Sequence, residues 1–175
     1  MSNFEISALD GTPATVDALS AMLVEAVAHG ASLGFMHPLS PAAAQAFWQD
    51  SLARAARCER VVLGAWDAGR LLGTVSLLLD CPPNQPHRAE IAKMFTRIDR
   101  RGRGIGSALI REAERIATEC RRTLLVLDTA EDGGAAKFYE RLGYRLTGAI
   151  PDYALKPQGG LTATLIYWKR LQPAR

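Results

Sequence analysis

The first third of the chain carries apolar residues at helical spacing. Residues 13–29 hold them three and four positions apart, which predicts a helix that ends at Gly30. This stripe consists of Leu19, Met22, Leu23, Ala26 and Val27. Ser40, which is followed by a proline, is a good N-cap and predicts a second helix over residues 41–57. The intervening residues 30–39 contain glycine and proline and predict an irregular loop.

Short apolar runs separated by turn residues follow these helices. Residues 61–66 and 71–79 are rich in apolar side chains and predict two strands. The turn residues between them, 67–69, favour an antiparallel hairpin. Residues 81–87 contain three prolines and predict a loop, and residues 89–96 predict a further strand.

The second half of the chain continues with a helix and a buried strand. A helix starting at about Ser107 is predicted from a single apolar stripe, formed by Leu109, Ala113, Ile116 and Cys120. Residues 124–127 form an uninterrupted apolar run that ends at Asp128, which is typical of a strand buried on both faces. One helix separates this strand from the strand at 89–96, so we expect the two strands to be parallel.

The last part of the chain predicts one more helix and two strands. Residues 134–142 read as a short helix that is closed by Gly143. Residues 144–150 and 161–171 then predict a final pair of strands.

Composition narrows the possible classes of protein. The 175 residues are 48% hydrophobic and can bury a full core, so we expect a single domain over residues 1–175. A net charge of +3 over a surface of mixed sign does not favour nucleic acid as a partner. The sequence has neither a signal-peptide pattern nor an apolar run of membrane-spanning length, so we expect a cytoplasmic protein without a membrane partner.

The cysteines and histidines do not predict a disulfide or a metal site. The three cysteines are odd in number and widely spaced, which favours reduced thiols; they are Cys58, Cys81 and Cys120. We expect Cys120 to be a small core residue on its helix. The three histidines lack ligand spacing with one another or with the cysteines, so no metal is expected.

An arginine- and glycine-rich turn joins the strand at 89–96 to the following helix. Three glycines stand at alternate positions, Gly102, Gly104 and Gly106. They lack the Cβ atoms that would keep an anionic ligand away from the backbone, and they permit dihedral angles that other residues resist. The helix N-terminus presents unpaired N–H groups to the same place. Three arginines add positive charge, Arg100, Arg101 and Arg103. The turn therefore predicts a pyrophosphate-binding site.

Two sequence motifs, in this order, resemble those of the GNAT N-acetyltransferases. Arg101-x-x-Gly104-x-Gly106 is similar to the acetyl-CoA pyrophosphate loop of this family, and the block from Ala135 to Tyr144 is similar to its other recurrent helix. Three shorter segments, GASLGFM, RAEIAKM and LDT, resemble the tabtoxin-resistance acetyltransferase group. The resemblance implies an α/β GNAT fold, with a mixed twisted sheet, helices on both faces and a splayed central pair of parallel strands.

The resemblance also implies acetyl-CoA as the cosubstrate and assigns residues to it. The backbone of residues 94–96 (Met94, Phe95 and Thr96) should pair with the pantetheine arm, with the Met94 N–H facing the thioester oxygen. Such a donor contributes roughly 100- to 1000-fold in rate. The remaining contacts are expected from Arg101, Gly102, Arg103, Gly104, Ile105, Gly106, Ser107, Ala135 and Phe138. Many family members have an asparagine where this chain has Asp132, and a carboxylate cannot donate the hydrogen bonds of an amide.

Three side chains are candidates for proton transfer during acetyl transfer to a primary amine. Tyr139 is the proposed general acid for the leaving thiolate. Glu90 is nominated as the general base, with Asp128 as its rival or partner, and either carboxylate could instead bind the substrate ammonium. A salt bridge of Glu90 with Arg88 or Lys93, a loop cap by Asp128 and a buried structural Tyr139 are the alternative roles. We expect a small-molecule acceptor, for which an amino-acid-like toxin or antibiotic is one candidate, and the sequence does not predict an oligomeric state.

Two other classes of protein share some of these features. A dinucleotide-binding domain also has a glycine turn between a strand and a helix, and it has an acidic residue at the end of the next strand, as Asp128 is here. The G-x-G-x-G spacing and the presence of one clear βαβ unit argue against it. A non-catalytic acetyl-CoA sensor would keep the turn without needing the three candidate proton-transfer residues.

Overall fold

Both N-terminal helices form where their caps predict them. The computed structural model describes residues 4–172, with α1 at Pro13–Ala28 and α2 at Pro41–Ala56. Ser40 caps α2, because its Oγ accepts a hydrogen bond from the Ala43 N–H at 3.1 Å. The two helices pack on one face of the sheet around Trp48, which is fully buried. Among the described residues no helix is both long enough and apolar enough to cross a bilayer.

Seven strands form one mixed sheet in the order β1-β2-β3-β4-β5-β7-β6. Their bounds are β1 Glu5–Ala8, β2 Arg60–Asp67, β3 Arg70–Leu78, β4 Arg88–Thr96, β5 Leu124–Ala130, β6 Arg145–Leu155 and β7 Leu161–Arg170. β2 and β3 form the predicted antiparallel hairpin, and Ala68 and Gly69 in its turn both have positive φ, as a type I′ hairpin turn requires. β4 and β5 are parallel, which confirms the predicted βαβ unit.

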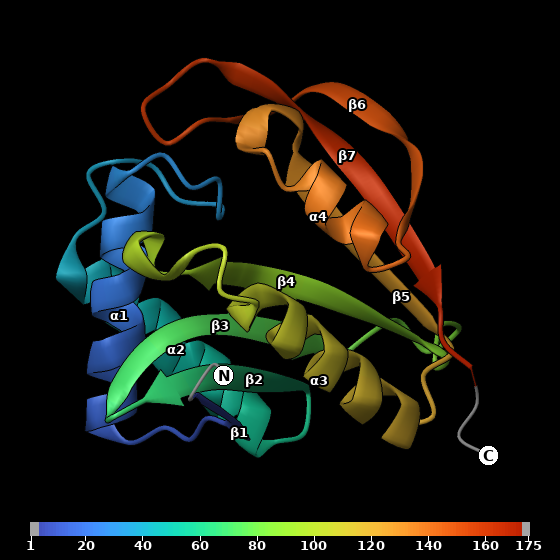
Figure 1. Ribbon diagram of the computed structural model, residues 1–175, viewed down its shortest axis with the longest axis horizontal. Helices are drawn as coiled ribbons and strands as arrows, with labels where there is room; N and C mark the ends of the chain where they lie inside the picture. Colours follow the sequence, from blue (N-terminus) through green and yellow to red (C-terminus); the bar gives the residue numbers. More distant parts are fainter. Residues whose placement is uncertain (1–3, 173–175) are drawn as a thin grey trace.

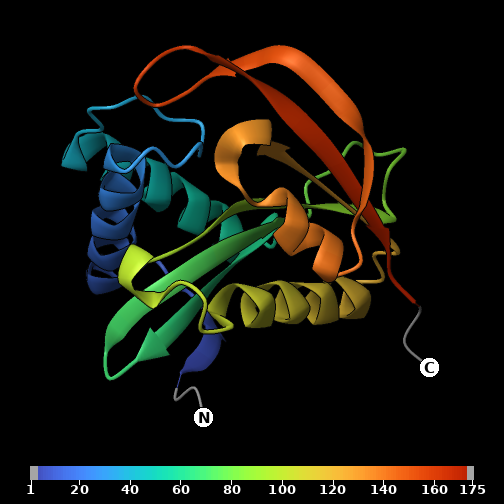
Figure 2. The ribbon, with the colours of Figure 1, turned by 45° about the horizontal axis from the view of Figure 1, so that its top comes forward.

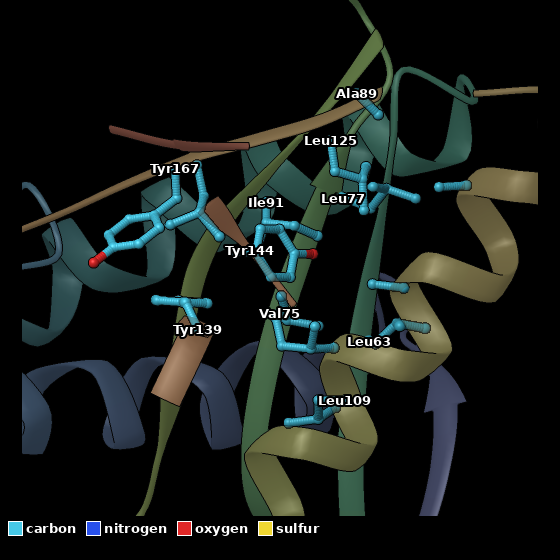
Figure 3. Close-up of a cluster of buried hydrophobic side chains, with 14 of the residues drawn as sticks. Leu63, Val75, Leu77, Ala89, Ile91, Leu109, Leu125, Tyr139, Tyr144 and Tyr167 are labelled. Atoms are coloured by element: carbon cyan, nitrogen blue, oxygen red, sulfur yellow. The ribbon is translucent and has the colours of Figure 1, made fainter. Parts of the chain in front are cut away.

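Two further helices cover the opposite face of the sheet. They are α3 at Ile105–Glu119 and α4 at Ala136–Arg141, and short 3-10 turns precede each of them, η1 at Ile98–Arg100 and η2 at Glu131–Gly133. The core beneath them runs from Leu109 of α3 across the central strands to three tyrosines, Tyr139, Tyr144 and Tyr167 (Figure 3). The sheet therefore has helices on both faces, as the sequence predicted (Figure 1).

The two central parallel strands separate part of the way along their length. Backbone pairing joins Arg88 to Leu124 at one end and stops at Glu90, which lies opposite Val126. Beyond this point both strands continue without pairing to each other, and Figure 1 shows them diverging. The gap left by this splay is where the two cavities described below are found.

The β6–β7 hairpin arches over α4, and its turn reaches the first helix (Figure 2). Gln158 in this turn donates through Nε2 to the backbone oxygen of Ala28 at 3.1 Å. The His37 N–H donates to the Pro157 oxygen at 2.9 Å. The hairpin turn is thus attached to the end of α1 and to the loop at residues 30–39.

Four sequence predictions differ from the structure. β1 was not predicted, because it is a four-residue edge strand without a clear apolar alternation. The strand predicted to end at residue 150 runs to Leu155 as β6, an edge strand, and an edge strand tolerates the missing N–H of Pro151. β5 continues past Asp128 to Ala130. Cys120 is exposed and does not belong to the core, because α3 ends at Glu119 and Cys120 is its C-cap.

Candidate active site

A one-residue bulge in β4 lies at the splay. β3 pairs Ser76 with Ala92 and Thr74 with Phe95, so both Lys93 and Met94 stand opposite a single residue of β3. Lys93 has a φ of 48°, which an ordinary strand does not contain. The bulge also changes the side-chain alternation, because Ile91 belongs to the core under α3 whereas Phe95 belongs to the core under α1 and α2.

A cleft of about 690 Å³ lies between the end of β4 and the starts of α3 and α4. The predicted cofactor residues that line it are Met94, Phe95, Thr96, Arg101, Gly102, Gly104, Ile105, Gly106, Ser107, Ala135 and Phe138. Arg103 is exposed and does not line this cleft. The two sequence motifs, about thirty residues apart in the chain, therefore lie on the walls of one cleft.

The glycine turn has the geometry of an anion site. Gly102 and Gly104 have φ values of 76° and 80°, and a Cβ at either position would meet no described atom within 4 Å, so the space above them is open. Gly106 has a different role, because a Cβ there would lie 2.5 Å from Met94 Cε, so the end of the Met94 side chain would have to move. It is a packing residue as well as part of the turn.

The start of α3 supplies hydrogen-bond donors at the same end of the cleft. Gly104 is the N-cap of α3, and its oxygen accepts the first helical hydrogen bond from the Ala108 N–H at 3.0 Å. The N–H groups of residues 105–107 precede this bond and have no partner within the helix. Arg100 and Arg101 line the cleft beside them. Together these groups can bind a pyrophosphate.

A second cavity of about 300 Å³ adjoins the cleft. Two segments far apart in the sequence contribute to it, the loop at residues 30–39 through Ser32, Leu33 and Gly34, and β6 through residues 153–155. The cleft and the cavity share six lining residues, Ser32, Leu33, Met94, Thr129, Ala130 and Tyr139. Groups bound in the two spaces would therefore meet at this common wall.

Tyr139 lies on the common wall, on α4. Its ring packs against Tyr144 at a centroid distance of 5.7 Å and against Tyr167 at 6.3 Å, and the residue is 6% exposed. Within residues 4–172 no side-chain hydrogen bond is formed by its hydroxyl, so the O–H is available to a bound molecule. Burial raises the pKa of Tyr139 well above the ordinary value, and the nearby charge of Asp128 raises it further. The phenol thus keeps its proton at neutral and mildly alkaline pH.

The two candidate carboxylates occupy different surroundings on one face of the sheet. Glu90 pairs with Val126 in register, and Asp128 lies two residues further along β5, so strand alternation puts both on the same face. Asp128 lines the second cavity, and its Oδ2 accepts a hydrogen bond from Thr164 Oγ1 at 2.9 Å. Glu90 lines neither space and forms a 3.3 Å salt bridge with Arg88.

Asp132, which stands where the resemblance implies an asparagine, has partners of its own. Its two carboxylate oxygens accept hydrogen bonds from Lys156 Nζ at 3.1 Å and from Thr162 Oγ1 at 3.0 Å. These bonds lower the pKa of Asp132, the one from Lys156 most. The residue lines the cleft, but its carboxylate joins η2 to the β6–β7 hairpin.

Lys93 is a feature of the site that the sequence did not reveal. Its Nζ donates to the Leu33 oxygen at 2.8 Å and lies 5.6 Å from the ring centroid of Phe35 and 5.7 Å from that of Phe47. Burial lowers the pKa of Lys93, and Asp128 and Glu90 oppose this effect. A lysine in a predicted strand does not by itself indicate a functional role. The position of the Lys93 ammonium depends on the bulge and on the backbone of a loop sixty residues away.

Comparison with known proteins agrees with this geometry. The model of the acetyltransferase (GNAT) family matches residues 24–144. The solved structure of the yncA protein of Salmonella typhimurium, with its cofactor acetyl-CoA, is 19% identical, covers 99% of this chain and 97% of its own, and has a TM-score of 0.80.

Two other solved structures have the same fold. The ribosomal-protein-alanine N-acetyltransferase of Brucella melitensis is 21% identical with a TM-score of 0.80, and 95% of this chain and 99% of that chain are covered. An aminoglycoside 6'-N-acetyltransferase complexed with coenzyme A is 18% identical with a TM-score of 0.74, covering 98% and 99%. At these identities the similarity establishes the fold, and the acceptors named for these proteins differ from one another.

Proposed function

The chain belongs to the acetyltransferase (GNAT) family and is an N-acetyltransferase that uses acetyl-CoA as its cosubstrate, and we propose that its acceptor is the primary amine of a small molecule. The observation that carries this proposal is the common wall at Met94 and Tyr139, between a cleft suited to a pyrophosphate and a smaller cavity. A volume of about 300 Å³ suits a small acceptor. We extend the proposal to residues 1–175 as a single domain of this kind.

The residues of the large cleft fit acetyl-CoA. The open space above Gly102 and Gly104, the first N–H groups of α3 and the flanking arginines would hold its pyrophosphate. The bulged backbone at Met94, with Phe95 and Thr96, would hold the pantetheine arm. When bound, acetyl-CoA supplies the acetyl group as an activated thioester. The Met94 N–H would donate a hydrogen bond to the carbonyl oxygen, where negative charge develops.

One side chain in the smaller cavity and one on the common wall would move the two protons of the reaction. Asp128 would take the proton of the acceptor ammonium, directly or through a water, because it lines the acceptor cavity. Tyr139 would donate its hydroxyl proton to the sulfur of the leaving thiolate. The salt bridge to Arg88 makes Glu90 the weaker candidate for the base. The amine attacks directly, so no acyl group is placed on the protein.

Asp128→Asn should lower kcat about 100-fold or more below the pKa of the acceptor amine, since few acceptor molecules arrive neutral there. The deficit should shrink at high pH, where the free amine needs no base. Glu90→Gln, a matched carboxylate-to-amide change outside both cavities, should stay close to wild type. The measurement is the pH profile of kcat and KM for all three proteins.

Three patterns in these profiles would count against Asp128 as the base. A raised KM with unchanged kcat would make Asp128 a binding residue for the ammonium. A loss confined to Glu90→Gln would transfer the role to Glu90. Profiles that superimpose on wild type for both variants would leave a water chain as the base.

The acceptor is tested by following thiol release from acetyl-CoA with a panel of amines. The panel should include amino acids, polyamines, aminoglycosides and amino-acid-like toxins, since an amino-acid-like toxin or antibiotic remains one candidate and the tabtoxin-resistance group is the proposed subgroup. Turnover with at least one small amine supports the proposal. Tight acetyl-CoA binding with no turnover on any amine would favour a sensor instead. The single parallel strand pair argues further against a dinucleotide-binding domain, whose sheet is mostly parallel.

A further inference from the structure

The acceptor cavity is bordered by two opposite charges from different strands. Lys93 comes from the bulge of β4, and Asp128 comes from β5 beyond the point where the two strands part. Both residues line the same cavity, and the charge of Asp128 raises the pKa of Lys93 against the effect of burial. A molecule in this cavity therefore lies between a cation and an anion.

The ammonium of Lys93 is only partly satisfied by the protein. It has three donors, and one of them is used by the Leu33 oxygen at 2.8 Å. The rings of Phe35 and Phe47 provide cation–π contacts but no lone pairs. Among the described residues no carboxylate forms a salt bridge with Nζ. A half-buried ammonium of this kind gains from an added anion.

The neighbouring charges are already paired. Glu90 is bound by Arg88 at 3.3 Å, and Arg60, which also acts on Lys93, lies 3.8 Å from Asp80. The charge that the cavity offers to a ligand is therefore one positive group and one negative group. A polyamine or an aminoglycoside, which carries several positive charges, would meet the cation as well as the anion.

We propose that Lys93 is a specificity-determining residue that binds the carboxylate of the acceptor, so that the preferred acceptors are amino carboxylates whose amine faces Asp128. This inference rests on the proposed function and names its substrate class. The loop at residues 30–39 contributes by holding Lys93 Nζ through the Leu33 oxygen.

Matched acceptors test the proposal without any change to the protein. The twenty L-amino acids are compared with their methyl esters and with the amines formed by removing the carboxyl group, since both changes keep the amine and remove the negative charge. For the best acceptors we expect kcat/KM to be at least tenfold higher for the acid. Equal or higher kcat/KM for the esters and amines would overturn the proposal.

A variant then assigns the preference to Lys93. Lys93→Met removes the charge and keeps an unbranched side chain only one atom shorter, which can still pack against the two rings. It should lower kcat/KM for the acid about tenfold or more, mainly through KM, while the ester changes little. Lys93→Arg should retain part of the preference. Lys137→Met removes one charge from the exposed side of α4, outside both cavities, and should leave the acid-to-ester ratio unchanged.

The outcomes separate this inference from the proposed function. If the esters and simple amines are acetylated with a kcat/KM equal to or higher than that of the acids, the proposed function stands and the role of Lys93 is wrong. If Lys93→Met keeps the wild-type acid-to-ester ratio, another group binds the carboxylate and the inference fails. If no amine is acetylated, the proposed function fails and this inference fails with it.

Discussion

Replacing Gly104 with valine should raise the dissociation constant of acetyl-CoA about 100-fold or more. The new branched side chain would fill the open space above the turn, where the pyrophosphate must approach the N–H groups of α3. Hydrogen bonds to a charged group are worth about 1.5–3 kcal/mol each, so the loss of two is enough for this effect. Isothermal titration calorimetry measures it directly.

Gly69→Val is the matched control for this change. Gly69 has nearly the same φ as Gly104, 76° against 80°, and a Cβ there would also meet no atom within 4 Å, but it lies in the β2–β3 turn and lines neither cavity. A side chain in this conformation costs roughly 1–2 kcal/mol, so both variants should remain folded. Unchanged acetyl-CoA binding in a folded Gly104→Val protein would show that the pyrophosphate binds elsewhere.

Tyr139→Phe should lower kcat by about 100-fold or more and leave acetyl-CoA binding within about twofold of wild type. The substitution keeps the ring and its contacts with Tyr144 and Tyr167 but removes the hydroxyl, and a positioned general acid is typically worth 100- to 10,000-fold. Because burial raises the pKa of Tyr139, its hydroxyl stays protonated, so the loss should persist from neutral to mildly alkaline pH. Steady-state kinetics with a good acceptor provides the measurement.

Tyr144→Phe controls for the loss of a buried hydroxyl from the same aromatic cluster. Tyr144 is 3% exposed and contacts Tyr139, but it lines neither cavity, so its variant should keep the wild-type kcat. If Tyr139→Phe retains more than half of the wild-type turnover, Tyr139 is a structural residue and the thiolate obtains its proton from another source.

Local patterns predicted most of the elements, because caps and turns act over a few residues. Ser40 caps α2, and the turn at Ala68 and Gly69 joins the hairpin, without help from distant parts of the chain. The parallel relation of β4 and β5 also follows from one intervening helix. β1 could not be predicted in this way, because its four residues are stabilised by pairing with β2, which lies more than fifty residues later.

In the candidate site, too, the features set by neighbouring residues could be predicted, and those set by distant parts of the chain could not. The glycine turn is contiguous in sequence, so its motif and its chemistry could be predicted together. The choice between Glu90 and Asp128 depends on strand register, which puts Asp128 in the cavity and leaves Glu90 beside Arg88. The position of the Lys93 ammonium could not be predicted either, because it is fixed by a bulge in one strand together with the backbone of a distant loop.

The bulge in β4 makes the length of this strand part of the catalytic design. Successive side chains of a regular strand point to opposite faces of the sheet, so residues four positions apart normally share a face. The extra residue of the bulge changes this alternation, and Ile91 and Phe95 therefore belong to the cores on opposite faces. Deleting one residue between them would restore a regular strand in the same register with β3. Three positions would then separate Ile91 from Phe95, which keeps them on opposite faces, whereas the bulged backbone at Lys93 and Met94 would be lost. The core alone would therefore accept a strand one residue shorter, and the extra residue serves the site at Lys93 and Met94.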